Sequence, residues 1–228
     1  MSDAPLRLVI FDVDGTLVDS QMDILAAMGQ AFDRAELPVP ARDEVLGIVG
    51  LSLPEAFERL AMGAPSALRL NMVEWYKDAY VALRAKVGAA QSSPFYPGAR
   101  EMLDRLHAVP EILLGVATGK SRRGLDKLLE GHDMRHFFVT QQVADHHPSK
   151  PHPAMILAAL SETGVAPDEA VMVGDTVFDM EMAQAAGVRS VAVSWGYHPA
   201  ERLSQANALI EDFNDLPGVL NGFWGTEI

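Results

Sequence analysis

The sequence predicts an α/β protein in which a doubly wound parallel sheet carries an inserted, all-helical segment. Short apolar runs alternate with helical patterns from about residue 94 onward, and one further run, 6–11, lies near the N-terminus. Such alternation is typical of a parallel sheet with helices on both faces. Between these two parts the pattern indicates helices alone. We therefore expect an α/β core made of residues 1–18 and 94–228, and a helical domain made of residues 19–93.

Each expected element follows from a local pattern. The run 6–11 is apolar and ends at Asp12-Val13-Asp14-Gly15, which indicates a buried strand followed by a turn. Ser20 is a candidate N-cap for a helix whose Leu25, Met28 and Phe32 share one face. Further helices are expected at 54–62, 67–86, 99–107, 154–162, 179–186 and around Leu125 to Leu129, and further strands at 112–117, 137–140, 170–173 and 189–193.

The composition limits the possible function classes. With 49% hydrophobic and 21% charged residues, the chain of 228 residues can bury a sizeable core. A net charge of −13 argues against binding to nucleic acid or to an anionic membrane, because both need a basic face. The absence of cysteine excludes disulfides, thiolate metal sites and cysteine nucleophiles. The first apolar run is too short for a signal peptide, so we expect a cytoplasmic protein.

Polar motifs follow the predicted strands and carry the candidate chemistry. They are Asp12 to Thr16, Ala117 to Lys120, Ser149 to Pro151 and Gly174 to Asp179. The lysine motif follows its strand after a loop, whereas the others begin where an apolar run stops. Because parallel strands end at one edge of a sheet, we expect these motifs to meet there. Several neighbouring carboxylates repel one another unless a cation lies among them, and oxygen ligands suit Mg²⁺.

These residue types are sufficient for phosphoryl transfer, which mainly needs positioning and charge neutralisation. A carboxylate at Asp12 or Asp14 can serve as the nucleophile. A hydroxyl such as that of Thr118, a cation such as Lys150 and a bound Mg²⁺ can together neutralise the phosphoryl group.

In these motifs, DVDGTLVDS, ATGK, SKPHP and GDTVFDM, the sequence resembles the haloacid dehalogenase-like (HAD) superfamily, and its pattern is most similar to phosphoglycolate-phosphatase-like members. The resemblance implies a Mg²⁺-dependent phosphatase acting on a small phosphorylated metabolite, with the helical segment as a mobile cap. It makes Asp12 the nucleophile, Asp14 the general acid and base, and Thr118, Gly119 and Lys150 the phosphoryl-binding residues. It assigns the metal to Asp12, the backbone carbonyl of Asp14, and Asp175, with Asp179 in support.

Other functions remain open at this stage. An acidic residue at Asp14 favours phosphate-ester hydrolysis over dehalogenation, because the alcohol needs an acid and the water needs a base. A β-phosphoglucomutase-like phosphomutase is one alternative, although Leu53 stands where those enzymes carry an arginine in the segment 50–55. A receiver-type phosphoacceptor module is another, and the helical insertion speaks against it. The substrate can be phosphoglycolate, a sugar phosphate, a nucleotide or pyrophosphate, and the oligomeric state is undefined.

Several residues also have simpler interpretations. Asp179 fits a helix cap as well as a metal-supporting residue. Histidines 146, 147 and 152 flank two prolines in a loop and lack the regular spacing of zinc ligands. Arg122 and Arg123 are expected to be solvated, although either can receive an anionic substrate. The aromatic residues 75, 76 and 80 fit burial inside the helical segment, and residues 195–198 favour packing over a place in the cleft.

Overall fold

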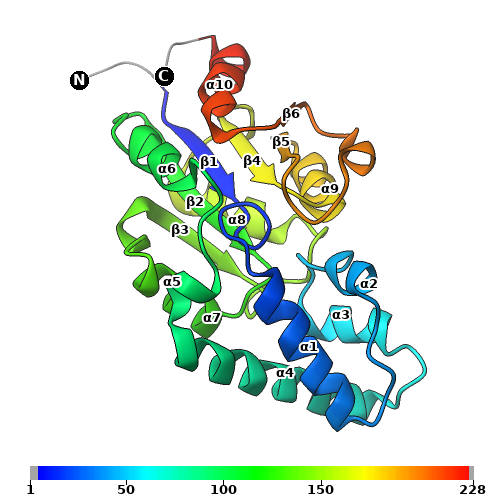
Figure 1. Cartoon of the computed structure of the whole chain (residues 1–228). Helices are drawn as coiled ribbons and strands as arrows, with labels where there is room; N and C mark the ends of the chain where they lie inside the picture. The colour runs from blue at the N-terminus through cyan, green and yellow to red at the C-terminus, as the bar shows by residue number, and fades with distance from the viewer. Residues whose placement is uncertain (1–4, 226–228) are drawn as a thin grey trace.

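A sheet of six parallel strands forms the centre of the molecule, in the order β3-β2-β1-β4-β5-β6 (Figure 1). The computed structural model describes residues 5–225. The strands are β1 (Arg7–Phe11), β2 (Ile112–Thr118), β3 (Phe138–Val143), β4 (Ala170–Gly174), β5 (Arg189–Val193) and β6 (Ala208–Ile210). From β1 the chain adds strands outward first on one side and then on the other. This doubly wound parallel sheet confirms the predicted fold class.

Helices cover both faces of the sheet because successive side chains of a strand point to opposite sides. Val9 and Phe11 of β1 pack with α6 (Ala99–His107), α7 (Arg122–Gly131) and α10 (Leu216–Trp224). Leu8 and Ile10 pack with α8 (Ala154–Thr163) and α9 (Val177–Ala186) on the other face. All five residues of β1 are buried, as expected for a central strand of a parallel sheet.

The segment between β1 and α6 is helical, as the sequence predicts. It contains α1 (Gln21–Arg34), α2 (Arg42–Leu46), α3 (Leu53–Leu60), α4 (Ser66–Val87) and α5 (Ala89–Ser92). Its buried residues, among them Phe32, Phe57 and Tyr76, form a hydrophobic cluster separate from those of the sheet. The long helices α1 and α4 lie side by side beyond the carboxyl ends of the strands (Figure 1). Domain boundaries at 18/19 and 93/94 stay a proposal.

Some elements were not expected. Helices α2 and α5 are only 5 and 4 residues long, too short for a clear apolar period. Strand β6 has three residues at the sheet's edge, with Leu209 exposed. Helix α10 contains Pro217, Gly218 and Gly222, residues that disfavour helix interiors, and its Pro217 is tolerated because it lies in the first turn.

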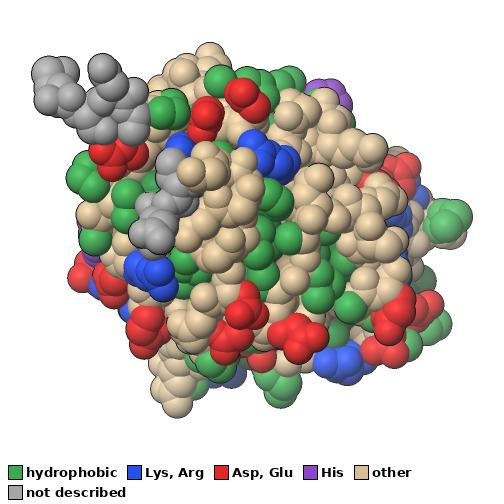
Figure 2. All heavy atoms as spheres, turned by 90° about the horizontal axis from the view of Figure 1, so that it is seen from above, with side chains coloured by type: hydrophobic (Ala, Val, Ile, Leu, Met, Phe, Trp, Pro, Cys, Tyr) green, Lys and Arg blue, Asp and Glu red, His purple; other side chains and the backbone are tan. Residues whose placement is uncertain are grey.

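The surface agrees with the negative net charge. On the face viewed in Figure 2, Asp and Glu side chains are spread around the protein, and Lys and Arg occur in small, scattered groups (Figure 2). None of the helices within residues 5–225 is long and apolar enough to cross a bilayer. Residues 1–4, which contribute to the expected cytoplasmic location, lie outside the described residues.

Candidate active site

The sheet topology brings the predicted site residues together at the carboxyl ends of the central strands. Asp12 follows β1, Thr118 ends β2, and Asp175 follows β4. Lys150 comes from the loop after β3, and Asp179 lies in the first turn of α9. All five side chains are buried. Segments more than 160 residues apart in the sequence therefore supply one compact group of charges.

Three carboxylates lie close together at this edge, and one lysine pairs with two of them. Asp12, Asp175 and Asp179 each place a carboxylate oxygen within 4.8 Å of the others. Lys150 Nζ lies 2.8 Å from Asp12 Oδ1 and 2.6 Å from Asp179 Oδ1. Both oxygens of Asp12 are buried, and within residues 5–225 Oδ2 has neither a hydrogen bond nor an ion pair. One ammonium group thus pairs with two of the three carboxylates, and Asp12 Oδ2 is left for a further partner.

Burial and mutual repulsion shift the protonation of this group. Burial raises the pKa of Asp12 to about 7. The charge of Lys150 lowers this pKa, and the charge of Asp179 raises it further. Burial and the neighbouring charges of Asp12 and Asp179 also raise the pKa of Asp175 well above its usual range. A divalent cation among these oxygens would relieve that repulsion, and an all-oxygen ligand set fits Mg²⁺.

Two glycines allow Asp175 to reach its position. A Cβ atom on Gly15 would lie 2.2 Å from Asp175 Oδ2, and one on Gly196 would lie 2.1 Å from Asp175 Cβ. Gly15 also adopts a φ of +88°, which other residues rarely tolerate. Thr16 Oγ1 donates to Asp175 Oδ1 at 3.0 Å, and the Tyr197 backbone N–H donates to Oδ2 at 2.8 Å. These contacts fix the carboxylate beside Asp12.

Asp179 completes the capping box of its helix, whose N-cap is Thr176, and also joins the acidic group. Its Oδ2 accepts hydrogen bonds from the Thr176 backbone N–H at 3.1 Å and from Thr176 Oγ1 at 2.7 Å, closing a capping box at the start of α9. Its other oxygen, Oδ1, accepts from Lys150 Nζ at 2.6 Å. The helix-cap interpretation of Asp179 therefore holds, and its support of a metal stays a prediction.

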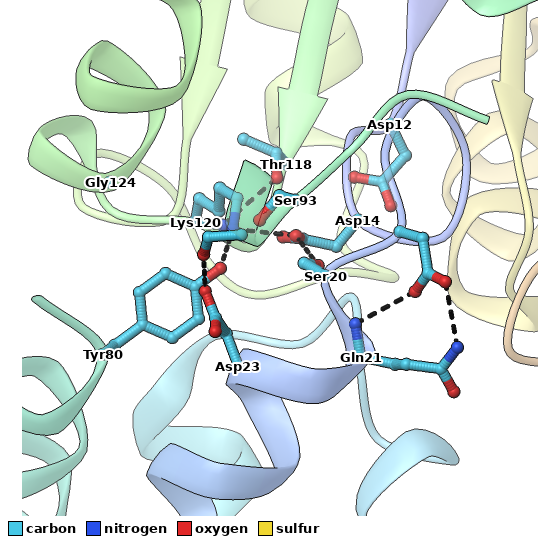
Figure 3. Close-up of polar contacts among 12 residues, drawn as sticks. Asp12, Asp14, Ser20, Gln21, Asp23, Tyr80, Ser93, Thr118, Lys120 and Gly124 are labelled. Atoms are coloured by element: carbon cyan, nitrogen blue, oxygen red, sulfur yellow. Dashed lines mark hydrogen bonds and ion pairs between the residues drawn. The ribbon is translucent and has the colours of Figure 1, made fainter. Parts of the chain in front are cut away.

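Asp14 is held apart from this group by a different set of partners. Lys120 Nζ lies 2.8 Å from Asp14 Oδ1, and Ser20 Oγ donates to the same oxygen (Figure 3). Lys120 also donates to the hydroxyl of Tyr80 on α4, at 3.2 Å. Burial alone would lower the pKa of Lys120, but the adjacent Asp14 and Tyr80 raise it above its ordinary value. The chain thus orients Asp14 from both the sheet and the helical segment.

Thr118 and Gly119 lie where the helical segment meets β2. Thr118 Oγ1 accepts from the Lys120 backbone N–H at 3.2 Å. A Cβ atom on Gly119 would lie 2.6 Å from the carbonyl oxygen of Gly50, so only glycine allows this approach. The Ser52 backbone N–H donates to Ser149 Oγ at 2.8 Å nearby. Through these contacts the loop before α3, residues 50–52, packs directly against Gly119 and Ser149.

A cavity of about 570 Å³ opens between the sheet edge and the helical segment. Asp12, Asp14, Thr118, Gly119 and Lys120 line its floor. Its other walls come from α1, α3, α4 and the start of α7. A ligand in this cavity would touch both Asp12 and Asp14.

Comparison with known proteins places the chain in a family. Residues 9–193 match the family described as haloacid dehalogenase-like hydrolase. The chain belongs to this family. This hydrolase is 31% identical over 230 residues to a phosphoglycolate phosphatase of Salmonella typhi, which covers 92% of this chain and 91% of the relative. It is 33% identical over 216 residues to the probable phosphatase IndB of Dickeya dadantii, with 92% of each covered. Both relatives are named as phosphatases.

A solved structure supports the same membership. The hydrolase from Pseudomonas syringae superposes with a TM-score of 0.83 at 25% identity, over 96% of this chain and 99% of that one. The fold, the family and its phosphatase relatives together make this HAD-like chain an enzyme of the hydrolase class.

Two side chains that contact Asp14, those of Ser20 and Lys120, were not singled out from the sequence as site residues. Ser20 occupies the N-cap position of α1, but its side chain makes no cap hydrogen bond and turns to Asp14 instead. Lys120 is the last residue of the ATGK motif, and its spacing of two residues from Thr118 is the signal that marks it. The roles of Asp12, Asp14, Thr118, Gly119, Lys150, Asp175 and Asp179 stay predictions.

The simpler interpretations have mixed outcomes. Arg122 Nη1 donates a hydrogen bond to Gln141 Oε1 at 2.9 Å. Arg123 is exposed, as expected, and lines the cavity. His147 Nε2 lies 2.8 Å from Gln142 Oε1, and within residues 5–225 no histidine belongs to a group able to hold a metal. Tyr76 and Tyr80 are buried as expected, yet they also line the cavity. Residues 195–198 do not line it, and they pack behind the acidic group instead, where Trp195 Nε1 donates to the Thr16 carbonyl at 3.1 Å.

Proposed function

We propose that this hydrolase is a Mg²⁺-dependent phosphatase that cleaves a small phosphate monoester through a phosphoaspartyl intermediate. The proposal depends on the buried group of Asp12, Asp175 and Asp179, whose carboxylate oxygens lie within 4.8 Å of one another. Asp12 reaches the cavity, and the one lysine of the group, Lys150, pairs with Asp12 and Asp179. Such a site concentrates more negative charge than its lysine neutralises, as a metal-assisted phosphoryl-transfer site does.

The proposed chemistry has two steps. An oxygen of Asp12 attacks phosphorus, the bond from phosphorus to the alcohol oxygen breaks, and Asp14 gives that oxygen a proton. Water then attacks the phosphorus of phosphorylated Asp12 and loses a proton to Asp14, which releases inorganic phosphate and restores Asp12. Lys120 and Ser20 orient Asp14, while Thr118 Oγ1, the Gly119 backbone and Lys150 Nζ hold the transferring phosphoryl oxygens.

The metal would be held by Asp12, the backbone carbonyl of Asp14, and Asp175, with Asp179 in support. When bound, Mg²⁺ would neutralise charge on the phosphoryl oxygens. The chain's own contribution is to fix the ligands: Thr16 and Tyr197 hold Asp175 at 3.0 Å and 2.8 Å, and Thr176 holds Asp179. We expect a cytoplasmic enzyme acting on a phosphorylated metabolite, without a nucleic acid or membrane partner.

Hydrolysis is favoured over isomerisation by the surroundings of the cavity. A phosphomutase must hold a second phosphate, and Leu53, on the cavity wall, offers no charge-assisted hydrogen bond. Arg59 is paired with Glu55 at 3.0 Å, and Arg69 donates to the carbonyl of Ala64, so both are engaged elsewhere. With β-glucose 1-phosphate and a catalytic amount of its 1,6-bisphosphate, we expect no build-up of glucose 6-phosphate.

The proposal is tested by phosphate release from a panel of monoesters, with Mg²⁺ and with excess chelator. We expect turnover with Mg²⁺ only, restored by adding Mg²⁺ back and poorly restored by Ca²⁺, which prefers more ligands at longer distances. Calorimetric titration of Mg²⁺ gives a readout that is independent of turnover. We expect Asp175→Ala to weaken Mg²⁺ binding more than Asp179→Ala does. Glu130→Ala, on the exposed face of α7, is the control and should leave Mg²⁺ binding unchanged. Full turnover in excess chelator would refute the metal site.

A further inference from the structure

The cavity changes character with distance from Asp12 and Asp14. Beyond the polar floor, its inner wall is built from apolar and aromatic side chains of the helical segment. They are Ile24, Met28, Val49, Leu51, Leu53, Ala56, Tyr76 and Tyr80. Most of these side chains are buried, and the rings of Tyr76 and Tyr80 stack with their centroids 5.8 Å apart. An apolar group placed here would be removed from water on several sides.

The buried cations on this wall already have partners. Lys120 is 2.8 Å from Asp14, and Arg84 donates to Ser93 Oγ at 2.9 Å and lies 4.0 Å from Asp23. At the outer rim, Lys77 and Lys127 pair with Glu74 and Glu130. Arg123, which has no ion-pair partner in the described part of the chain, is exposed. Arg84 Nε is buried and makes no hydrogen bond within the described residues, but Asp23 already faces its charge. A negatively charged group on the inner wall would therefore have to compete with Asp14 for Lys120 or with Asp23 for Arg84.

We propose that this cavity receives the alcohol portion of the substrate, and that this portion is bulky and apolar, as in an arylalkyl or branched alkyl phosphate. The inference rests on the proposed phosphatase function, because it assumes that the phosphate lies at Asp12. A volume of about 570 Å³ falls within the range of roughly 300–1,000 Å³ that is typical of sites for drug-sized ligands. A two-carbon ester such as phosphoglycolate would leave most of it unfilled and would make few contacts with the apolar wall.

The test compares esters whose alcohols leave with similar ease. Ethyl phosphate and 2-phenylethyl phosphate both release a primary alkoxide, so a difference in kcat/KM reports contacts made by the phenyl group. With Mg²⁺ present, we expect 2-phenylethyl phosphate to exceed ethyl phosphate by roughly 10- to 100-fold in kcat/KM, since a few buried carbons give discrimination of this order. We expect phosphoglycolate to be no better than ethyl phosphate.

A pair of neighbouring substitutions on α4 tests whether the cavity causes the preference. Val81 lines the cavity and is 42% exposed, so Val81→Gln puts an amide into the apolar wall at little risk to folding. Ala82, the next residue, is exposed and does not line the cavity. We expect Val81→Gln to reduce the ratio of kcat/KM for the two esters by about threefold or more. The matched control, Ala82→Gln, should keep the wild-type ratio.

The outcomes separate this inference from the phosphatase proposal. Hydrolysis of ethyl phosphate or phosphoglycolate without any advantage for 2-phenylethyl phosphate would overturn the apolar assignment and leave the phosphatase proposal standing. A preference that Val81→Gln and Ala82→Gln change equally would overturn the placement in this cavity. Failure to hydrolyse any ester of the panel with Mg²⁺ would overturn both.

Discussion

At the scale of single residues, the orientation of Asp14 depends on two neighbouring side chains. Both belong to the sequence motifs, but the motifs alone do not show that they contact Asp14. Lys120 holds it at 2.8 Å, and Ser20 donates to the same oxygen. Both neighbours are buried or nearly so, and Lys120 contacts Tyr80 of the helical segment as well. The orientation of the proposed general acid therefore depends on contacts from both parts of the chain.

Replacing Lys120 by methionine should slow turnover without removing the nucleophile. The methionine keeps much of the apolar stem, but Asp14 loses the charge that orients it, and a proton donor misplaced by about an ångström costs roughly 10- to 100-fold in kcat. Steady-state kinetics with one monoester checks this. Lys86→Met, at the exposed end of α4 and outside the cavity lining, is the control and should retain wild-type kcat. Wild-type kcat in Lys120→Met would remove the positioning role.

Gly196 should tolerate no side chain, because an added Cβ would lie 2.1 Å from Asp175 Cβ. We expect Gly196→Ala to lower the free energy of unfolding by about 1–3 kcal/mol through overpacking, and to weaken Mg²⁺ binding by displacing Asp175. Gly222→Ala is the control: nothing lies within 4 Å of its added Cβ, and it should raise stability by about 0.5–1 kcal/mol by favouring helix α10. Denaturant unfolding and Mg²⁺ titration of both variants provide the comparison. Equal effects at the two glycines would contradict the packing argument.

At the scale of elements, His198 joins the start of α9 to the end of α2. Its Nδ1 accepts from the Val177 backbone N–H at 3.1 Å, and its Nε2 lies 3.1 Å from the carbonyl of Gly47. These two bonds require one protonated and one free ring nitrogen, which is the neutral form. Burial lowers the pKa of His198 below its usual value of 6.5, while the bond to Gly47 opposes that shift.

This arrangement predicts the direction of a pH effect on stability. Because the folded-state pKa is lowered, the unfolded chain binds more protons below about pH 6.5, so the contribution of His198 is present above that pH and is lost as the pH falls. The difference in unfolding free energy between the wild type and His198→Asn should therefore shrink between pH 7.5 and pH 5.5. Denaturant titrations at the two pH values measure it. A difference that grows as the pH falls would contradict the neutral, bridging histidine.

The elements also indicate how far the sequence alone was informative. Helix α6 and strand β5 have the predicted bounds, because their apolar periods are regular and their ends are marked. Strand β6 was missed because three residues define no period, and α2 was missed for a similar reason. The apolar lining of the cavity was not foreseen either: Tyr76 and Tyr80 have the spacing of core residues, and only the packing of α4 against α1 shows that they also face a ligand space.

At the scale of the whole molecule, the fold gathers buried cations at one site of a strongly negative protein. The net charge is −13, yet Lys120 lies beside Asp14 and Lys150 beside Asp12, because the segments that follow β1, β2 and β3 meet at one edge of the sheet. The helical segment closes over this edge and supplies the apolar wall. We infer that the sheet determines the phosphoryl chemistry and that the insertion determines which alcohol accompanies it.

The central claim is that Asp12 carries the phosphoryl group during turnover. Its most direct test is a single turnover with a monoester labelled with radioactive phosphorus, quenched in acid within milliseconds, followed by digestion and mapping of the labelled peptide. We predict transient label on the peptide that contains Asp12, and none in Asp12→Asn, which keeps the side-chain shape but lacks the nucleophilic charge. Release of phosphate at the wild-type rate without protein-bound label, or label on a peptide that lacks Asp12, would contradict the claim.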